Sequence, residues 1–536
     1  MLNSDAGLPG RDTPIRPDGD AVEATPAGIP VARSAGSLVP PAAGTILLAL
    51  CWLYPNAVPD CRSDQINDMF EYVKLSRIIA ANVEYPTKHW MPGFPLLLAG
   101  LMKCFGTDWM ALKMAMFAIA CGAMLAAWRL FRAVVPVAAA GSLALVLAST
   151  PIVFDYTHRL MSEIPALLSS IVALLALVHV VRGDDRRGFW GWVIVLAVGS
   201  SVAVLVRGNA LAIAPALVVG IFRCGKSSRR RQRLALVGAL MAILGTFVAW
   251  TIRSERYQYD GIHNVTYLQE IQAQDIEALW RASGRFGEGV ERVDARALAS
   301  RVYGNLCWHQ IYQIDALLIP AADRLAELKR PGVGLGLAAL LLLPQIVGLP
   351  LLARRSPEAL AFLLASMALI LLYPTGGSSR MLLPTVPLLL LNGYLGLEGL
   401  LGLPATRGWL AAIMAANLAI CAIEADKQRL QPYSREGFQD FLDLIVEDLP
   451  RERRPGEQVG SDLSVEVFAL TGLAAQESEK ALSAVARGEA GSALLACPSP
   501  RRFEPGLEAK PLARRGEVYL YRVTKGADLN PDPSGR

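Results

Sequence analysis

The chain has 536 residues, 53% of them hydrophobic, and a formal net charge of +5. Its mean hydropathy of +0.36 is too high for an ordinary soluble protein of this length, so the composition indicates a membrane protein. The basic loops described below account for the positive charge. That charge therefore indicates nothing about the substrate, and we expect no nucleic-acid partner.

The chain starts with a polar, proline-rich stretch. We expect residues 1–37 to be disordered and cytoplasmic, and not a signal peptide, since no short apolar core follows a basic start. Eleven apolar runs follow, some shorter or interrupted once by a charge, where a membrane-spanning helix needs about 20 residues. In chain order they lie within Ser34–Pro59, Trp109–Trp128, Ala133–Phe154, Ile164–Val181, Gly188–Val206, Gly208–Phe222, Leu234–Ile252, Pro331–Ala353, Ala359–Ser379, Met381–Leu403 and Gly408–Ile423.

The basic residues predict the orientation, because Lys and Arg in short loops stay on the cytoplasmic side. If the first helix starts inside, all four basic loops are cytoplasmic, provided that Met91–Met102 does not cross. That segment is short and opens with Pro-Gly-Phe-Pro, so we expect it to be interfacial or re-entrant. The prediction is an all-α polytopic protein with about 11 crossings, its N-terminus inside and its C-terminus outside. The basic loops contain Arg129 and Arg132, Arg182 to Arg187, Arg223 to Arg233, and Arg354 with Arg355.

This topology predicts three parts of the chain. Residues 38–423 form the transmembrane domain, with outer loops at 60–90, 155–163 and 253–330, and the first of these loops should contain interfacial helices. Residues 424–536 form a small α/β module outside the membrane, in which a helix precedes strands. The expected strands are Ser464–Leu470, Ala493–Cys497 and Val518–Val523, chosen for their β-branched and apolar residues.

Carboxylates gather in the first outer loop. Asp64, Asp68, Glu71 and Tyr72 lie about one helical turn apart, so a helix would present them on adjoining faces. Such a pattern is typical either of a functional site at the membrane boundary or of an amphipathic helix that lies solvated on the membrane surface.

The second outer loop is dense in titratable groups. It contains Asp155, His158, Arg159 and Glu163 just above the bilayer, where ionisable groups are candidates for function. His158 and Arg159 are candidates for substrate binding, and interfacial anchoring is the alternative for the whole loop.

Five segments, in this order, resemble the motifs of the GT-C glycosyltransferases, most of all the protein O-mannosyltransferase and lipid A aminoarabinose transferase groups. The resemblance covers about residues 45–400. The chain departs from the aminoarabinose transferases at Met69, where they have Glu, and at Glu163, where Asp is frequent. The segments are Asp68-Met-Phe-Glu-Tyr72-Val-Lys-Leu-Ser-Arg77, Lys88-His89-Trp90-Met91-Pro92-Gly93-Phe94-Pro95, Arg159-Leu-Met-Ser162-Glu163-Ile-Pro165, Arg207-Gly208 and Arg380-Met-Leu-Leu-Pro384-Thr-Val-Pro387.

The resemblance implies the GT-C fold and a reaction at the outer face of the cytoplasmic (inner) membrane. Members of the superfamily move a sugar from a polyprenyl-phosphate carrier to an acceptor. Here the acceptor is a glycolipid, a polysaccharide or a protein, and neither its identity nor that of the sugar follows from the sequence. The expected partners are thus the lipid-linked donor, this acceptor and the membrane lipid.

The carboxylates suit such a reaction. An acceptor hydroxyl needs a general base, and Asp68 is the best candidate. Displacement at the anomeric carbon passes through an oxocarbenium-like state that a carboxylate stabilises. We expect Glu163 to do this or to orient the acceptor, with Asp64 as a further catalytic candidate and Asp155 as its alternative.

Arginine suits the leaving phosphate, because its planar fork binds phosphate through two parallel hydrogen bonds. Arg207 and Arg380 lie in short outer turns, where the orientation rule predicts few basic residues. We expect both to bind the donor phosphate, with Lys88 or His89 assisting. Snorkelling to lipid headgroups is the alternative. Tyr72 is either a sugar or acceptor contact or an interfacial anchor.

No cofactor is expected. Asp64, Asp68, His158 and Glu163 would be the ligands of a divalent metal, but no pair has a diagnostic spacing. The cysteine spacings leave open whether Cys61, Cys307 and Cys497 form disulfides.

Two other classes remain as alternatives. A secondary transporter would place its polar site at the bilayer midplane between repeated halves, and no repeat is visible. An O-antigen polymerase or ligase uses similar lipid carriers, but it would draw arginines from a large outer loop. The Asp68 motif argues against it.

Overall fold

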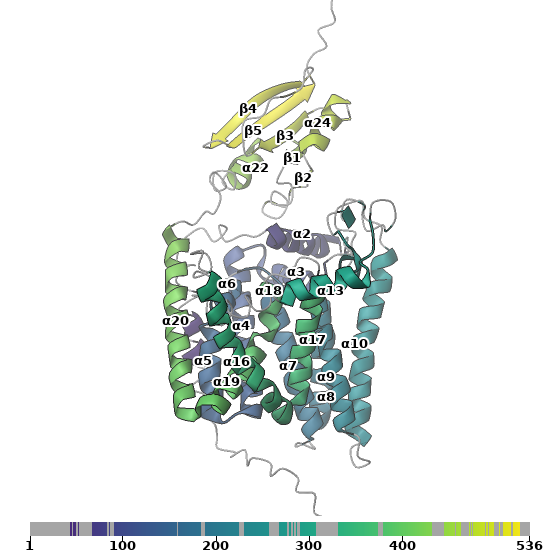
Figure 1. Cartoon of the computed structure of the whole chain (residues 1–536). Coiled ribbons are helices and arrows are strands. Elements are labelled where there is room, and N and C mark those ends of the chain that lie inside the picture. Colours follow the sequence, from purple (N-terminus) through teal and green to yellow (C-terminus); the bar gives the residue numbers. More distant parts are fainter. Residues whose placement is uncertain are drawn as a thin grey trace, which may run out of the picture. The chain divides into compact units, whose positions relative to one another are not determined.

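The structure is a computed structural model of the full chain, and it is mostly helical (Figure 1). Six of the described helices are long and apolar enough to cross a membrane, or seven if one bent helix pair counts as a single span. The protein is therefore a polytopic membrane protein. The count of eleven crossings stays a prediction. The described residues are mainly 67–82, 90–157, 159–183, 188–224, 230–256, 267–275, 290–306, 331–373, 379–430, 444–455, 457–461, 478–487, 492–497, 507–515 and 518–525, with shorter pieces between these and at 43–52.

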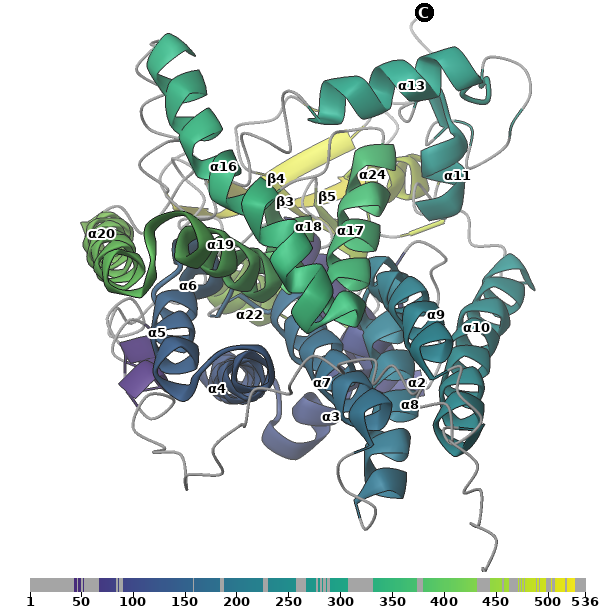
Figure 2. The same ribbon diagram turned by 60° about the horizontal axis from the view of Figure 1, so that its bottom comes forward.

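Helices make up the membrane part, and several are broken by proline or glycine. Figures 1 and 2 show α8, α9 and α10 side by side, and α16 packs along α19. The helices are α2 (Asn67–Asn82), α3 (Gly93–Phe105), α4 (Trp109–Val134), α5 (Val137–Ala148), α6 (Pro151–Thr157), α7 (Glu163–Arg182), α8 (Phe189–Val206), η1 (Gly208–Ala212), α9 (Ile213–Arg223), α10 (Arg230–Arg256), α11 (Tyr267–Gln272), α13 (Ala295–Gly304), α16 (Pro331–Arg355), α17 (Pro357–Leu372), α18 (Ser379–Leu382), η4 (Leu383–Thr385), α19 (Val386–Leu401) and α20 (Leu403–Leu430).

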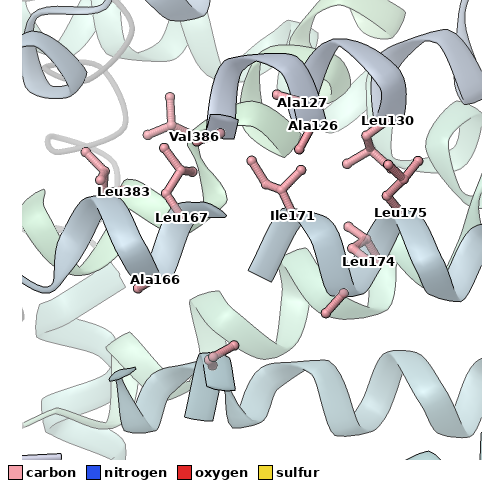
Figure 3. Close-up of a cluster of buried hydrophobic side chains, with 14 of the residues drawn as sticks. Ala126, Ala127, Leu130, Ala166, Leu167, Ile171, Leu174, Leu175, Leu383 and Val386 are labelled. Carbon is pink, nitrogen blue, oxygen red and sulfur yellow. The ribbon is translucent and has the colours of Figure 1, made fainter. Parts of the chain in front are cut away.

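Helix α7 lies at the centre of this bundle. It is apolar on all sides, as expected for a helix that is surrounded by others, and most of its residues are buried. It packs against α4, α8 and η4. Figure 3 shows Leu167, Ile171 and Leu175 of α7 among Leu130 of α4 and Val386 of α19. This packing fixes the first turn of α7, where Glu163 lies.

The apolar run predicted at Ala133–Phe154 is not one helix. Helix α4 continues to Val134, Pro136 precedes α5, and α6 begins at Pro151 with a bend of 59° from α5. Each proline lacks the amide hydrogen that an uninterrupted helix would need. As a result Asp155 lies in a helix, and the second outer loop is shorter than the predicted turn.

Helix α3 is 13 residues long, about 20 Å at 1.5 Å per residue. This is less than the roughly 30 Å hydrocarbon core, which agrees with the expectation that Met91–Met102 is interfacial or re-entrant. The predicted helix in the first outer loop is confirmed as α2. It contacts α3 and lies across one end of the bundle (Figure 1).

The C-terminal module is an α/β sandwich with sheet order β2-β1-β3-β5-β4. The first three strands in this order are parallel, and β5 pairs antiparallel with both β3 and β4. Apolar clusters lie on both faces, one including η5 and α22, the other α24. The elements are η5 (Leu444–Asp448), α22 (Leu449–Glu452), β1 (Gln458–Ser461), β2 (Ala475–Gln476), α24 (Ser478–Ala486), β3 (Ser492–Cys497), β4 (Leu507–Arg515) and β5 (Val518–Lys525).

Two predicted strands are confirmed as β3 and β5, and Cys497 is buried at the end of β3. The predicted strand Ser464–Leu470 lies outside the described residues, as do residues 1–37, Cys61 and Cys307. Strands β1, β2 and β4 are missing from the prediction. Strand β4 carries charges and a proline (Leu507-Glu-Ala-Lys-Pro511-Leu-Ala-Arg-Arg515), because it pairs on one side only, at the edge of the sheet.

Candidate active site

Asp68 and Arg380 form an ion pair between two distant parts of the chain. Asp68 lies in the first turn of α2, where the partial positive charge of a helix N-terminus stabilises a carboxylate. Arg380 lies in α18, just before the Leu-Pro-Thr turn of η4. Both side chains are partly exposed, at 23% for Asp68 and 27% for Arg380.

A second pair joins Glu163 to Arg207, with 2.6 Å between Oε1 and Nη1. Glu163 lies in the first turn of α7, and Arg207 caps the C-terminal end of α8 in an extended conformation. Each charge therefore lies at the helix end that favours it. This pair is the more buried one, with exposures of 1% for Glu163 and 11% for Arg207.

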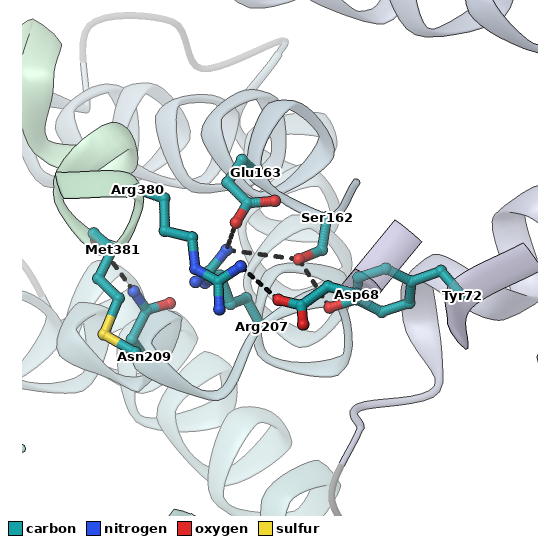
Figure 4. Close-up of polar contacts among 8 residues, drawn as sticks. All are labelled: Asp68, Tyr72, Ser162, Glu163, Arg207, Asn209, Arg380 and Met381. Atoms are coloured by element: carbon teal, nitrogen blue, oxygen red, sulfur yellow. Dashed lines mark hydrogen bonds and ion pairs between the residues drawn. The ribbon is translucent and has the colours of Figure 1, made fainter. Parts of the chain in front are cut away.

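Ser162 connects this pair to α2. Its Oγ lies 3.4 Å from Nη1 of Arg207, which donates to it, and 3.1 Å from the hydroxyl of Tyr72. Figure 4 shows Asp68, Ser162, Glu163, Arg207 and Arg380 converging from α2, α7, α8 and α18 on one place. We call Asp68, Glu163, Arg207 and Arg380 the charge quartet.

The quartet is formally neutral, since it combines two carboxylates with two guanidinium groups. The other oxygen of Glu163, Oε2, is buried and accepts no hydrogen bond from the described residues. A buried carboxylate oxygen without a donor is costly. Such an oxygen is able to accept a hydrogen bond from a hydroxyl or amine of a bound molecule.

Tyr72 is buried rather than placed at a lipid surface. Its ring contacts Trp90 and Phe94 edge-on, each at a centroid distance of 4.8 Å. Through these contacts α2 is fixed to the start of α3. The hydroxyl of Tyr72 points to Ser162 and the quartet (Figure 4), and both roles considered for this residue stay predictions.

Two glycines allow the Pro-Gly segment before α3 and the Arg-Gly segment after α8 to lie in direct contact. A Cβ on Gly93 would lie 2.6 Å from the backbone of Leu205 and Val206, closer than atoms can approach. A Cβ on Gly208 would lie 3.1 Å from the side chain of Met91. The start of α3 thus touches the end of α8 directly, and this contact sets the position of Arg207.

Arg159 does not join the quartet among the described contacts. It binds Asp155 at 2.6 Å, and its guanidinium lies 5.4 Å from the ring centroid of Tyr156. Asp64, Lys88, His89 and His158 are predicted site residues that lie outside the described residues.

Ser162 and Asn209 are not among the site residues predicted from the sequence. Asn209 follows the Arg207-Gly208 turn and donates from Nδ2 to the carbonyl of Met381 at 3.3 Å. It thus ties the turn with Arg207 to the helix with Arg380 (Figure 4). Ser162 is part of a motif segment, directly before Glu163, and Asn209 directly follows the Arg207-Gly208 motif.

Within the described part of the chain, no three His, Cys, Asp or Glu side chains gather in a geometry suited to a metal ion. Asp68 and Glu163 each face a guanidinium instead.

No protein-family model and no curated protein sequence matches this chain. Similarity appears among solved structures. ArnT from Cupriavidus metallidurans bound to undecaprenyl phosphate matches with a TM-score of 0.56 and 12% identity, over 90% of this chain and 97% of that chain. The apo state of the same protein matches with a TM-score of 0.56, 13% identity and the same coverage. AglB, an archaeal oligosaccharyltransferase from Archaeoglobus fulgidus, gives a TM-score of 0.48 at 14% identity, over 86% of this chain and 69% of that chain.

At this identity the match with ArnT shows the fold and not the activity. The chain has the GT-C fold that the resemblance of the motifs implied.

Proposed function

We propose that this protein is a membrane glycosyltransferase that moves a sugar from a polyprenyl-phosphate carrier to an acceptor at the outer face of the cytoplasmic membrane. The charge quartet carries this proposal: two carboxylates and two arginines, from four helices, meet at one end of a GT-C bundle. The ArnT structure with undecaprenyl phosphate supports a lipid-phosphate carrier as the donor.

In the proposed reaction, an oxygen of the acceptor attacks the anomeric carbon of the donor sugar. The bond between this carbon and the phosphate oxygen breaks, and its electron pair leaves with the polyprenyl phosphate. Asp68 takes the proton from the acceptor hydroxyl. Glu163 offers its buried Oε2 to the sugar and stabilises the positive charge that develops on the ring.

The arginines bind the phosphate. Negative charge grows on the bridging oxygen as the bond breaks, so guanidinium groups next to it stabilise the transition state more than the bound donor. Arg380 is the more accessible of the two, and Arg207 supports it from the buried pair with Glu163. Arg207 lies at the end of α8 and Arg380 in the short helix α18, and we expect both at the lipid–water boundary, where the phosphate of a membrane-anchored carrier lies.

A comparison of envelope glycans tests the proposal. Glycolipids, polysaccharides and glycoproteins are analysed by mass spectrometry in cells that lack the gene and in cells complemented with variants. We expect one class to lose the mass of a sugar without the gene, and the wild type to restore it. Asp68→Asn should not restore it.

Glu71→Gln is the matched control, because Glu71 lies on the same helix one turn from Asp68 and pairs with Lys74. It should restore the sugar like the wild type. Unchanged glycans in the deletion strain, or full restoration by Asp68→Asn, would contradict the proposed function.

A further inference from the structure

The two ion pairs of the quartet differ in burial, and this difference separates the roles of the two arginines. Glu163 and Arg207 are almost enclosed, and Ser162 adds a second side-chain contact to Arg207. Asp68 and Arg380 are each about one quarter exposed. A ligand phosphate that enters the site therefore reaches Arg380 more easily than Arg207.

Separating the more exposed pair, Asp68 and Arg380, also costs less free energy than separating Glu163 and Arg207. A partly exposed ion pair contributes little, because water solvates the separated charges. Opening the buried pair would leave a carboxylate without a partner in a low-dielectric environment, which is strongly unfavourable. An incoming phosphate should thus displace Asp68 from Arg380 and leave Glu163 on Arg207.

We propose that Asp68 is an internal competitor for the donor phosphate: in the unliganded protein it occupies the Arg380 guanidinium that the phosphate takes when the donor binds. This inference rests on the proposed function and adds the order of events: the donor binds first, and Asp68 accepts the proton afterwards. The phosphate releases the Oδ2 atom of Asp68 from Arg380, and only then does this oxygen accept the proton of an acceptor. The base thus becomes available when the donor is in place.

Competition predicts that substitution of Asp68 strengthens the binding of the donor phosphate and weakens catalysis. Asp68→Asn removes the competitor, so polyprenyl phosphate should bind about two- to fivefold more tightly, the range that partly exposed ion pairs contribute. The same substitution removes the base and abolishes most of the transfer. A residue that merely supported the fold would weaken both.

The experiment measures the affinity of the purified full-length protein in nanodiscs for undecaprenyl phosphate, with undecaprenol as the uncharged control. The variants are Asp68→Asn, Arg380→Gln and the double variant. Competition predicts that Asp68→Asn gains affinity, that Arg380→Gln loses it, and that the gain from Asp68→Asn disappears in the Arg380→Gln background.

Glu71→Gln separates competition from a general charge effect, since it removes one negative charge from the same helix at a residue that pairs with Lys74. It should leave the affinity unchanged. The inference is overturned if Asp68→Asn brings no gain, if the gain persists without Arg380, or if Glu71→Gln brings the same gain. If the wild-type protein binds undecaprenyl phosphate no more tightly than undecaprenol, the proposed function itself fails.

Discussion

The Glu163–Arg207 pair is buried between α7 and α8, and its two members depend on each other. Removing Arg207 would leave the carboxylate of Glu163 uncompensated, which costs about 3–5 kcal/mol in comparable buried pairs. Arg207→Ala should therefore lower the thermal stability of the protein in detergent.

The double variant Arg207→Gln with Glu163→Gln removes both charges and should recover most of that stability while transfer stays lost. Equal stability of Arg207→Ala and the wild type would show that the pair is not buried as described.

Asp68 lies in the more exposed pair, so its loss should affect chemistry rather than folding. Asp68→Asn keeps the shape of the side chain and should reduce the rate of transfer by roughly 10² or more, the usual contribution of a positioned general base. Asp64→Asn should reduce it less. Initial rates in isolated membranes, at matched expression, measure both. A near-normal rate in Asp68→Asn would remove the base assignment and point to an acceptor that needs no deprotonation.

Among the helices, the contact between α3 and α8 positions the site without supplying a reactive group. Gly93→Ala would place a methyl group 2.6 Å from the backbone at Leu205 and Val206, so the end of α8 must move. We expect turnover to fall at least tenfold, because a shift near 1 Å at a catalytic group costs on the order of 10² in rate.

Gly100→Ala is the matched control, since it lies in the same helix with open space around its Cβ position. It should leave turnover unchanged. Equal rates for the two variants would show that α8 does not depend on this contact.

The C-terminal module contains a buried acid whose environment predicts a pH dependence. Burial raises the pKa of Glu457, but hydrogen bonds from Arg522, the Arg454 amide and Ser492 outweigh it, and the pKa lies below its ordinary value of 4.5. Because the folded-state pKa is the lower one, the stabilisation is present above about pH 4.5 and is lost as the pH falls through the folded-state value.

Glu457→Gln should accordingly weaken the module at pH 7 and matter progressively less in acid. Hydrogen–deuterium exchange of β1 and β3 in the full-length protein, corrected for the intrinsic rate at each pH, measures this. If the difference in exchange between variant and wild type instead grew in acid, the folded-state pKa of Glu457 would not be the lower one.

The bundle as a whole separates its charges between two ends. The quartet lies where α7 begins and α8 ends, and α9 leads away from it to Arg223, which pairs with Glu358 of α17 at 2.5 Å. Arg355 of α16 pairs with Glu398 of α19. Arg223 and Arg355, two of the predicted cytoplasmic arginines, thus lie at the C-terminal ends of α9 and α16.

This arrangement agrees with a topology in which the quartet faces the outside, a sidedness that reporter fusions would test. Fusions after Arg233 and Arg355 should report the cytoplasm, and fusions after Ser63 and Gly460 the outer side. Ser63 and Gly460 on opposite sides would make the number of crossings even, with Met91–Met102 as the first segment to re-examine.

The sequence predicted much of this site because local physics suffices for it. Apolar runs require spanning helices, and one-turn spacing requires that Asp68 and Tyr72 share a helix, as α2 confirms. The bend before α6 was missed although Pro151 was visible, because hydropathy over a window averages across a proline. Strand β4 was missed because its edge position makes it as polar as a loop.

What the sequence by itself determined is the set of charges and the helices at whose ends they lie, since the bilayer acts on each segment separately. The tertiary structure alone decided the pairing: Arg380 with Asp68, 312 residues apart, and Arg207 with Glu163. Pairing depends on which helix ends meet, and that follows from contacts such as Gly93 on Leu205 and the packing around α7. No local pattern encodes these contacts, because each of them needs two distant segments at once.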